Sequence, residues 1–597
     1  MALDFDTATA ALGNPLGNSP GGPLAGITSR LDFPHLFSQH ARLLQLATAL
    51  DATALVPQTL QVREGVNELF RIEVEAVSTS AHLELKAFIG EQVTVSLMRA
   101  DGRLRHWHGY ATRAQSLGAD GGLGRYRLVL EPWLAFLARR RDTFLYQGKP
   151  NQGITARDII EDLFKDHPQA SWRWDATQAL MAREICTQYR ESDLAFVQRL
   201  LAEEGLSYRF EHADSADTGH DGSQARHCLV ISDAQGLPDQ QRDLGAIRFA
   251  LPEVGHRGSL QADTVTAFSA ARAVTSNALT LGAWAPARVA GVSATGAGDK
   301  PQAVPVLEVY QGQRTERFAD ASQADARLDV MAQRELAARQ GPQQRFDAES
   351  NVRHLIEGAR FTLAEHFSEG GHAFTVLTVE HQAANNLGPE LARHLGTPEL
   401  EHGSYRNRFS ALSAASPLLP HPRPKPIAPG MQTAIVVGTP DQGAGTGIHT
   451  ERDGRVKVQF PWQRGAKPLS GGLAHDERSA DKAGNAPSQD TSGTWVRVAQ
   501  PSAGANWGAL LLPRVGSEVL IAFIAPTSTS PSSPPSSTTD RTHYRMPPAW
   551  TPASTTPVSS AACTPTRSTA VVLPAGSSTT PPARPACGSC AAPAPPS

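Results

Sequence analysis

Residues 447–460 read GIHTERDGRVKVQF, and residues 493–523 read GTWVRVAQPSAGANWGALLLPRVGSEVLIAF. In the first segment Val456, Val458 and Phe460 fall on one face of an extended chain, and residues 455, 457 and 459 between them are Arg, Lys and Gln. This alternation is typical of a half-buried β-strand, and residues 496–498 repeat it. Residues 519–524 are apolar on both faces, which predicts a strand buried on both sides. Several short strands separated by Gly, Pro and Asn predict a small OB-like β-barrel over residues 431–526.

The composition indicates sizeable cores and little net charge. Of 597 residues, 40% are hydrophobic and 19% are charged, with a net charge of −3 and a pI of about 6.7. Phosphate binding needs a concentrated basic face, so this balance argues against a general nucleic-acid or membrane-surface binder. No apolar run approaches the roughly 20 residues of a membrane span. Residues 1–30 lack the basic start and apolar core of a Sec signal peptide. We therefore expect secretion, if it occurs, to use a machine that accepts folded protein from the cytoplasm.

The residues before the barrel divide into three regions. Residues 1–30 are rich in Gly, Pro, Asn and Ala and are expected to be disordered. Residues 31–415 contain strand-like alternation at 60–77, 93–97, 106–110 and 126–130, which predicts antiparallel strands closing into a barrel. Residues 416–430 are a Pro-rich, semi-rigid connector. Within the following barrel, residues 465–493 are a polar insert, expected to be a surface loop.

Three helices are expected among these strands. Thr155 and Asp158 have the spacing of a capping box before the apolar stripe of residues 159–164. A second helix is predicted over residues 192–204, where Gly205 ends it. A third spans roughly residues 321–339, with Asp320 as its N-cap. The expected fold class is therefore mainly β with some helices (α+β).

Two phrases of the sequence resemble the VgrG family, also called Rhs element Vgr proteins, the trimeric tip proteins of type VI secretion systems. Residues 448–462 fit the family phrase IHTxxxGRVKVQFxW, and the resemblance continues from Trp495 to Phe523. Residues 188–205, QYRESDLAFVQRLLAEEG, are similar to a recurrent phrase of the family's hub. The family in turn resembles the hub and spike proteins of contractile-phage tails.

This resemblance implies a phage-hub-like region over 31–415, made of two barrel subdomains with helices, followed by the spike barrel. It implies a homotrimer whose three hubs form a pseudo-sixfold ring on a hexameric tube protein, with baseplate, tip-capping and effector proteins as further partners. The implied role is structural: the tip caps the tube, contacts a target membrane transiently and delivers effectors. Such a protein is expected in the cytoplasm before firing and is then secreted without a signal peptide.

The sequence after Ile524 differs from everything before it. Residues 527–597 are dominated by Pro, Ser, Thr and Ala, whereas the family continues with a spike of short repeated strands. The favoured interpretation is an out-of-frame translation after a coding shift near Ala525, because the change is abrupt and GC-rich genes yield this composition in the wrong frame. A disordered tail, or a short natural variant with a linker, are the alternatives. We therefore expect a truncated tip protein that assembles a hub but, without the spike repeats, fails as a full puncturing tip.

Two patterns in the N-terminal half could carry chemistry. Ser19 lies in GNSPG, which matches the G-x-S-x-G nucleophile pattern, but no strand precedes it and no helix follows. We therefore predict a flexible segment. His106 and His108 share one face of a strand and could hold a metal, yet no third ligand is fixed by spacing. We predict structural or surface histidines. Cys186 and Cys228 are expected to be buried free thiols rather than a disulfide.

The remaining patterns lie in the C-terminal half. Cys587 and Cys590 form a C-x-x-C at the end of a Pro/Ala tail, where chance is the better explanation. Residues 443–447 are Gly-rich but lack the Lys of a phosphate loop, which favours a flexible hairpin connection. The barrel tryptophans could bind oligomers on one face, but no basic groove accompanies them, so a core or subunit-interface role is predicted; they are Trp462, Trp495 and Trp507.

The sequence therefore predicts no catalytic residue, no cofactor-binding residue and no metal ligand, and a protein that is not an enzyme. Two alternatives stay open. The chain could be a baseplate hub or spike protein of a contractile phage, or the remnant of an effector-carrying tip protein that has lost an enzymatic domain.

Overall fold

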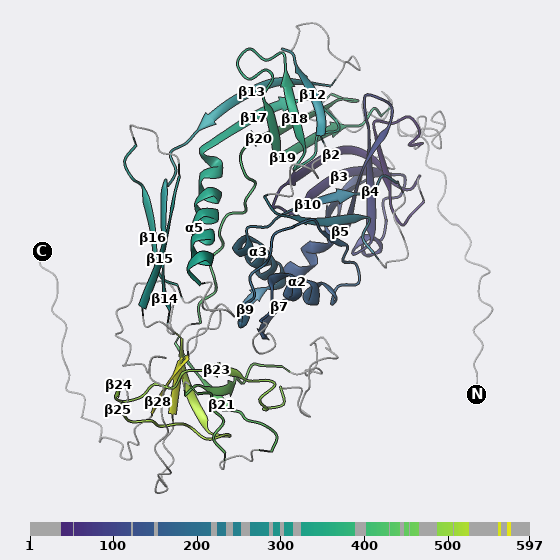
Figure 1. The fold of residues 1–597 in the computed structure, drawn as a ribbon. Coiled ribbons are helices and arrows are strands. Elements are labelled where there is room, and N and C mark those ends of the chain that lie inside the picture. The colour runs from purple at the N-terminus through teal and green to yellow at the C-terminus, as the bar shows by residue number, and fades with distance from the viewer. Residues whose placement is uncertain are drawn as a thin grey trace, which may run out of the picture.

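The computed structural model describes residues 38–523 with internal gaps, together with two short stretches at 559–562 and 570–574. The longest gaps within 38–523 are 217–223, 235–242, 252–262, 315–323, 388–400 and 465–485. Figure 1 shows two strand-rich barrels at the top, helices with small sheets in the middle, and a small C-terminal barrel below them. The predicted disordered segment 1–30 lies outside the described residues. Among the described residues, no helix is both long and apolar enough to cross a membrane.

The first barrel is the antiparallel arrangement that the alternating residues predict. Its strands follow the order β1-β4-β5-β6-β3-β2, and Phe70, Ile72 and Val74 face its core with at most 1% of their surface exposed. The Asn385 side chain joins the two end strands, because it bonds to both Leu44 main-chain groups and to the Pro57 carbonyl. The strands are β1 (Leu44–Ala47), β2 (Val56–Gly65), β3 (Arg71–Ser78), β4 (Gln92–Met98), β5 (Leu104–Asp120) and β6 (Leu123–Glu131).

The second barrel is closed, because its sheet runs β19-β18-β12-β13-β17-β20 and β20 pairs with β19 again. Its core is aromatic, and the Phe346 and Phe374 rings meet edge to face with centroids 4.8 Å apart. β19 also pairs with β2 from Thr378–Gly65 to Ala384–Thr59, so the two barrels share one continuous sheet. The strands are β12 (Asp243–Phe249), β13 (Thr264–Arg272), β17 (Gln344–Ser350), β18 (Arg360–Ala364), β19 (Ala373–Ala384) and β20 (Tyr405–Ser413).

Two helices lie below the first barrel, and both begin and end where the sequence predicts. α2 (Ala156–Phe164) has the predicted capping box, since the Asp158 amide donates to the Thr155 hydroxyl at 3.2 Å and the Thr155 amide donates to the Asp158 carboxylate at 2.9 Å. α3 (Asp193–Glu204) ends at Gly205, whose φ of 69° is the left-handed conformation that glycine adopts without strain. The accompanying elements are η1 (Leu85–Phe88), η2 (Trp133–Ala138), β7 (Arg141–Gln147), β8 (Trp172–Trp174), β9 (Ile185–Ser192), β10 (Ser207–His212) and β11 (His227–Ser232).

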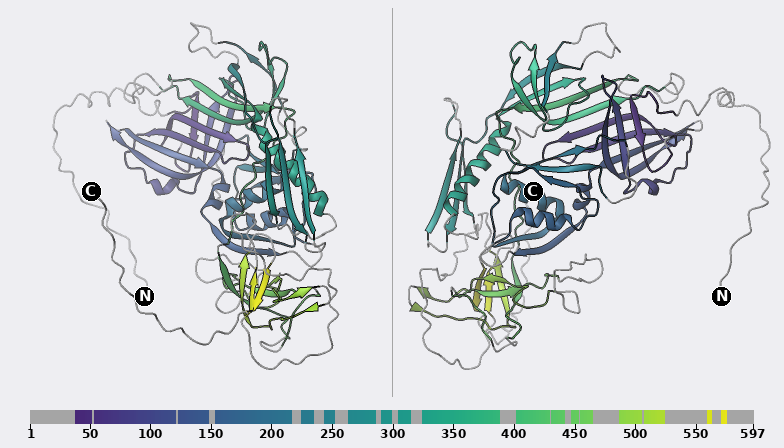
Figure 2. Two further views of the ribbon diagram at one scale, coloured as in Figure 1. Left: turned by 90° about the vertical axis from the view of Figure 1, so that its left-hand side faces the viewer. Right: turned by 45° about the vertical axis from the view of Figure 1, so that its right-hand side comes forward.

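The third helix, α5 (Ala324–Gln340), covers a separate sheet with the order β15-β14-β16. Leu328, Met331 and Leu336 of the helix pack against Leu279 and Leu281 of the sheet. The proposed cap Asp320 lies outside the described residues. This sheet was not predicted, because two of its strands, residues 278–285 and 290–297, are rich in Ala and Gly, which favour strands weakly. The strands are β14 (Ala278–Ala285), β15 (Ala290–Ala297) and β16 (Glu308–Arg314), and η5 (Gly341–Gln343) follows the helix (Figure 2).

The C-terminal barrel, residues 431–523 and called the spike barrel below, has the predicted apolar core. Val456, Val458, Val519 and Ile521 are fully buried, in a sheet of order β23-β22-β21-β26-β27-β28. β27 and β28 belong to the Pro/Ser/Thr/Ala-rich tail, whose composition predicts no strands; the rest of the tail lies outside the described residues. The strands are β21 (Met431–Val436), β22 (Val456–Gln459), β23 (Thr494–Val496), β24 (Ala503–Gly504), β25 (Trp507–Gly508), β26 (Glu518–Phe523), β27 (Ser559–Ala562) and β28 (Ala570–Pro574).

Two details of the spike barrel differ from the expectation. Gln459, placed on the polar face, is only 7% exposed, because its amide donates to the Ala486 carbonyl at 3.1 Å and accepts from the Ser488 amide at 2.8 Å. The last part of the predicted insert, from residue 486 onward, is therefore attached to the barrel. Leu520 lies on the opposite face of β26 from Val519 and Ile521 and is only half-buried, so a single copy of the chain covers that face only partly.

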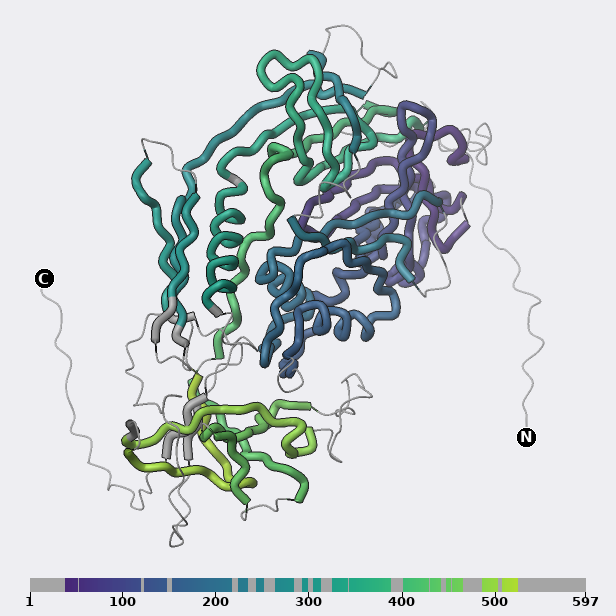
Figure 3. Tube along the Cα trace, in the orientation of Figure 1, coloured from purple at the N-terminus to yellow at the C-terminus, as the bar shows by residue number. Residues whose placement is uncertain are grey.

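The connector, residues 416–428, packs against the helical region. Leu418 is 5% exposed, and its carbonyl accepts a hydrogen bond from the Ser207 hydroxyl at 3.0 Å. Lys425 forms an ion pair with Glu203 of α3 at 3.5 Å. Figure 3 shows the chain running from the second barrel past α5 and down to the spike barrel.

Candidate functional site

A buried ionic network holds the end of α3 to β9 and to the loop before it. Arg183 lies 2.7 Å from Glu203 and 2.5 Å from Glu204. Arg199 pairs with Glu191 at 2.6 Å and with Glu203 at 3.1 Å. No side chain among these five is more than 9% exposed. Burial alone would lower the pKa of Arg183, but the Glu203 and Glu204 carboxylates raise it above its ordinary value, so the guanidinium stays charged.

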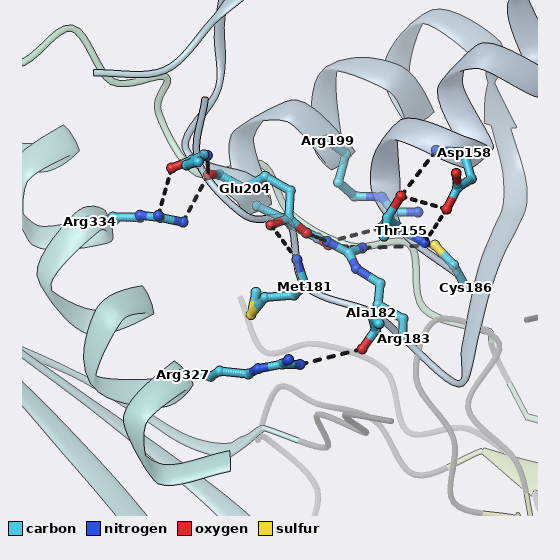
Figure 4. A network of polar contacts seen from close by, with 12 residues as sticks. Thr155, Asp158, Met181, Ala182, Arg183, Cys186, Arg199, Glu204, Arg327 and Arg334 are labelled. Atoms are coloured by element: carbon cyan, nitrogen blue, oxygen red, sulfur yellow. Dashed lines mark hydrogen bonds and ion pairs between the residues drawn. The ribbon is translucent and has the colours of Figure 1, made fainter. Parts of the chain in front are cut away.

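The same network reaches α5, as Figure 4 shows. Arg334 donates to the Glu204 carbonyl at 3.0 Å and to the Gln178 side chain at 2.7 Å. Together with the Lys425–Glu203 pair, these contacts tie α3, α5 and the connector to one centre. Close pairing of buried charges in this way is typical of a structural joint.

A second buried centre lies where the two barrels meet. Glu64 of β2 is 1% exposed and pairs with Arg105 of β5 at 2.6 Å and with His381 of β19 at 2.7 Å. Burial would raise the pKa of Glu64, yet Arg105 and the His381 hydrogen bond hold it well below its usual value. Burial and Arg105 lower the pKa of His381 to about 4, so its neutral ring donates to the Glu64 carboxylate. Burial and the nearby Glu64 charge raise the pKa of Glu357 well above its ordinary value.

The spike barrel is fastened to the helical region by polar contacts that the sequence analysis did not foresee. The Trp462 indole donates to Gln432 at 2.9 Å, and Gln432 donates to the Tyr189 hydroxyl at 2.8 Å. Arg464 pairs with Asp142 of β7 at 2.9 Å. Trp462 thus serves a joint between domains. Tyr189 lies in residues 188–205, whose sequence indicates a family resemblance but not this contact with the spike barrel.

The other two tryptophans lie differently. Trp495 is half-buried, with the His449 ring stacked on it at 5.1 Å and the Lys457 ammonium 5.2 Å from its centre. Trp507 is 62% exposed within one chain, which does not fit a core role. The spike barrel exposes further apolar side chains, at Met431, Ile435, Ile448 and Leu511. An apolar surface of this kind is typical of a contact with another chain.

The candidate chemical residues are not brought together. His106 and His108 bond to Ser96 and Thr94, each at 2.8 Å, and His108 also contacts the Ala213 carbonyl at 2.9 Å. Within the described part of the chain, no group of three or more His, Cys, Asp or Glu side chains could hold a metal ion. Cys186 is a buried free thiol as predicted, whereas Cys228 is free but only half-buried. Ser19, Cys587, Cys590 and residues 443–446 lie outside the described residues.

Comparisons with known proteins agree with this architecture. The model of the phage tail baseplate hub family matches residues 63–387, more than half of the chain. The model of the type VI secretion system/phage-baseplate injector OB domain matches residues 482–534. The fold and these matches define a phage-tail-like hub joined to an injector barrel. The chain belongs to the VgrG family, as the sequence resemblance predicts.

Individual relatives support the same family. The chain is 28% identical to the type VI secretion system spike protein VgrG1c of Pseudomonas aeruginosa. The matched segment of 509 residues covers 84% of this chain and 62% of that protein. The chain is 27% identical to the actin cross-linking toxin VgrG1 of Vibrio cholerae, over 80% of this chain and 40% of the toxin. The chain thus spans about three fifths of the length of the first of these relatives.

The fold is also found in a solved structure from Escherichia coli. That protein is described as a type VI secretion component with structural similarity to two tail proteins of bacteriophage T4. The TM-score is 0.52 at 19% identity, over 80% of this chain and 96% of that chain. At this identity the likeness shows a common fold.

Proposed function

We propose that this chain is the structural tip of a type VI secretion system, a homotrimeric hub that caps a hexameric tube protein. The observation that carries the proposal is the pair of six-stranded barrels fused through β2 and β19, with a third barrel fastened beneath them. Three copies of a two-barrel hub give six similar units around one axis, which suits a sixfold ring partner. The relatives' names favour a secretion system over a phage tail.

The proposed role is mechanical and needs no bond chemistry. The two ionic centres and the hub–barrel joint hold the parts rigidly, which suits a device that transmits force along its axis. Baseplate, tip-capping and effector proteins are further expected partners. In this proposal the protein resides in the cytoplasm and, when the apparatus fires, is expelled by it and meets the target membrane transiently.

The exposed apolar surface of the spike barrel supports self-association, since it would be covered in a trimer. The test is sedimentation of the purified chain at micromolar concentration, followed by capture with a tube protein from a type VI gene cluster. A trimer that binds the tube protein is the expected result. A monomer that does not bind the tube protein would overturn the proposal.

A further inference from the structure

One aromatic side chain stands out on the second barrel. Phe367, in the turn between β18 and β19, is 89% exposed, the highest value among the large hydrophobic residues that the structure describes. Leu251 is 72% exposed. The parallel strands β12 and β18 pair with each other for the last time at Arg248 and Ala364. Leu251 lies three residues beyond Arg248, and Phe367 lies three residues beyond Ala364. Each strand is therefore followed, two or three residues past its end, by an exposed apolar residue.

The turn that presents Phe367 is firmly built. Glu365 adopts a φ of 62°, unusual for a residue with a side chain, and its carboxylate pairs with Arg248 at 2.6 Å. The His366 ring is inserted beneath the turn, 4.5 Å from the Phe249 ring and 8% exposed, and it accepts the Glu369 amide at 3.0 Å. The Phe367 ring stacks on His366 at 4.3 Å. The exposed ring thus sits on a fixed base and loses little freedom on binding.

The turn faces away from the spike barrel. The residues just before β18 lie against β10, since the Phe210 amide donates to Glu357 at 3.2 Å and a side chain at Gly358 would meet Arg209. β18 runs outward from there, so its far end points away from the helices and from the spike barrel below them. Figures 1 and 3 show the β18–β19 region at the top of the molecule, opposite the spike barrel.

We propose that Phe367 is a docking knob that inserts into an apolar socket on the end face of the ring-forming tube protein. This inference rests on the proposed function, because the end opposite the spike barrel is the end that would meet the tube. Each protomer supplies one knob, so a trimer engages the ring at three of its six subunits. A rigid, exposed aromatic residue is the type of side chain that dominates binding at protein interfaces.

The experiment measures the affinity of the full chain for the hexameric tube protein from the same gene cluster, by biolayer interferometry. Phe367→Ser is compared with Tyr310→Ser, a matched control that removes an aromatic ring, 69% exposed, from the separate sheet on β16. We expect Phe367→Ser to weaken binding at least about tenfold. Tyr310→Ser should stay within about twofold of the wild type, and Phe367→Leu should retain most of the affinity.

The outcomes separate the inference from the function it rests on. Failure of the wild-type trimer to bind the tube protein overturns both. Binding by the wild type with equal affinity for Phe367→Ser overturns the knob alone. Loss of the trimer in Phe367→Ser, measured by sedimentation, also overturns it, because the ring would then contact another copy of this chain. Unchanged binding to the tube with lost binding to anionic lipid vesicles would assign the residue to a membrane instead.

Discussion

Replacing Arg183 by Met should destabilise the end of α3 more than any single surface change. The Arg183 side chain is 5% exposed, and its removal leaves Glu204, which is fully buried, without its 2.5 Å partner. Within the described residues, a further hydrogen-bond donor to the Glu204 carboxylate is the Met181 amide, at 3.5 Å. Breaking a buried ion pair by removing one partner costs about 3–5 kcal/mol, because the remaining charge is desolvated without compensation.

Arg157→Met is the matched control. Arg157 also pairs with a glutamate, Glu161 at 2.8 Å, but the two side chains are 52% and 31% exposed, so its loss should cost less than about 1 kcal/mol. The assay is native-state hydrogen exchange of the amides in residues 193–204, which reports the local opening free energy. Equal protection in the Arg183 and Arg157 variants would refute the reasoning. A double variant, Arg183→Met with Glu204→Leu, should recover part of the loss, since both charges are then absent.

Three further changes test other parts of the molecule. Val458→Asp should lower the thermal stability of the spike barrel by several degrees or unfold it, whereas Thr433→Asp on the exposed face of β21 should change it little; similar losses would mean that the strand register is wrong. Glu357→Gln should stabilise the hub at pH 8 but not near pH 4.5. The pKa of Glu357 is raised in the folded state, so this carboxyl destabilises the fold increasingly as the pH rises above its unfolded pKa, and has no such effect below it. A pH-independent difference in urea midpoints would contradict the assignment. Gly205→Ala should cost about 1–2 kcal/mol, because φ is 69° there, and Gly205→Asn less; identical urea midpoints for both variants and the wild type would argue against the left-handed cap.

Local patterns predicted much of this fold. The capping box at Thr155, the stop at Gly205 and the apolar face of β22 follow from neighbours in the sequence, and all three are present. Periodicity also indicated the strands of the first barrel. The family resemblance supplied the second barrel and the spike barrel's relation to the hub, which residue patterns alone did not give.

Long-range polar contacts were not predictable in this way. Glu64 and His381 are far apart in the sequence, and a single sequence offers no sign that they share a buried centre. Gln459 was placed on the solvent side because its polarity fits the alternation, but a hydrogen-bonded amide can be buried at little cost. The exposure of Phe367 could not be predicted from the sequence either, because a phenylalanine between two strands is normally expected to be buried in the core.

The pairing of β2 with β19 has a consequence for how the chain folds during synthesis. Gly65 emerges from the ribosome more than three hundred residues before its partner Thr378. The first barrel can assemble early from strands β1 to β6, but β2 then keeps one unpaired edge until β19 is made. Exposed strand edges promote association between chains, and pairings between distant segments form slowly. We therefore expect the nascent hub to depend on chaperones, and mutations that delay the second barrel to cause aggregation through β2 while the first barrel stays folded.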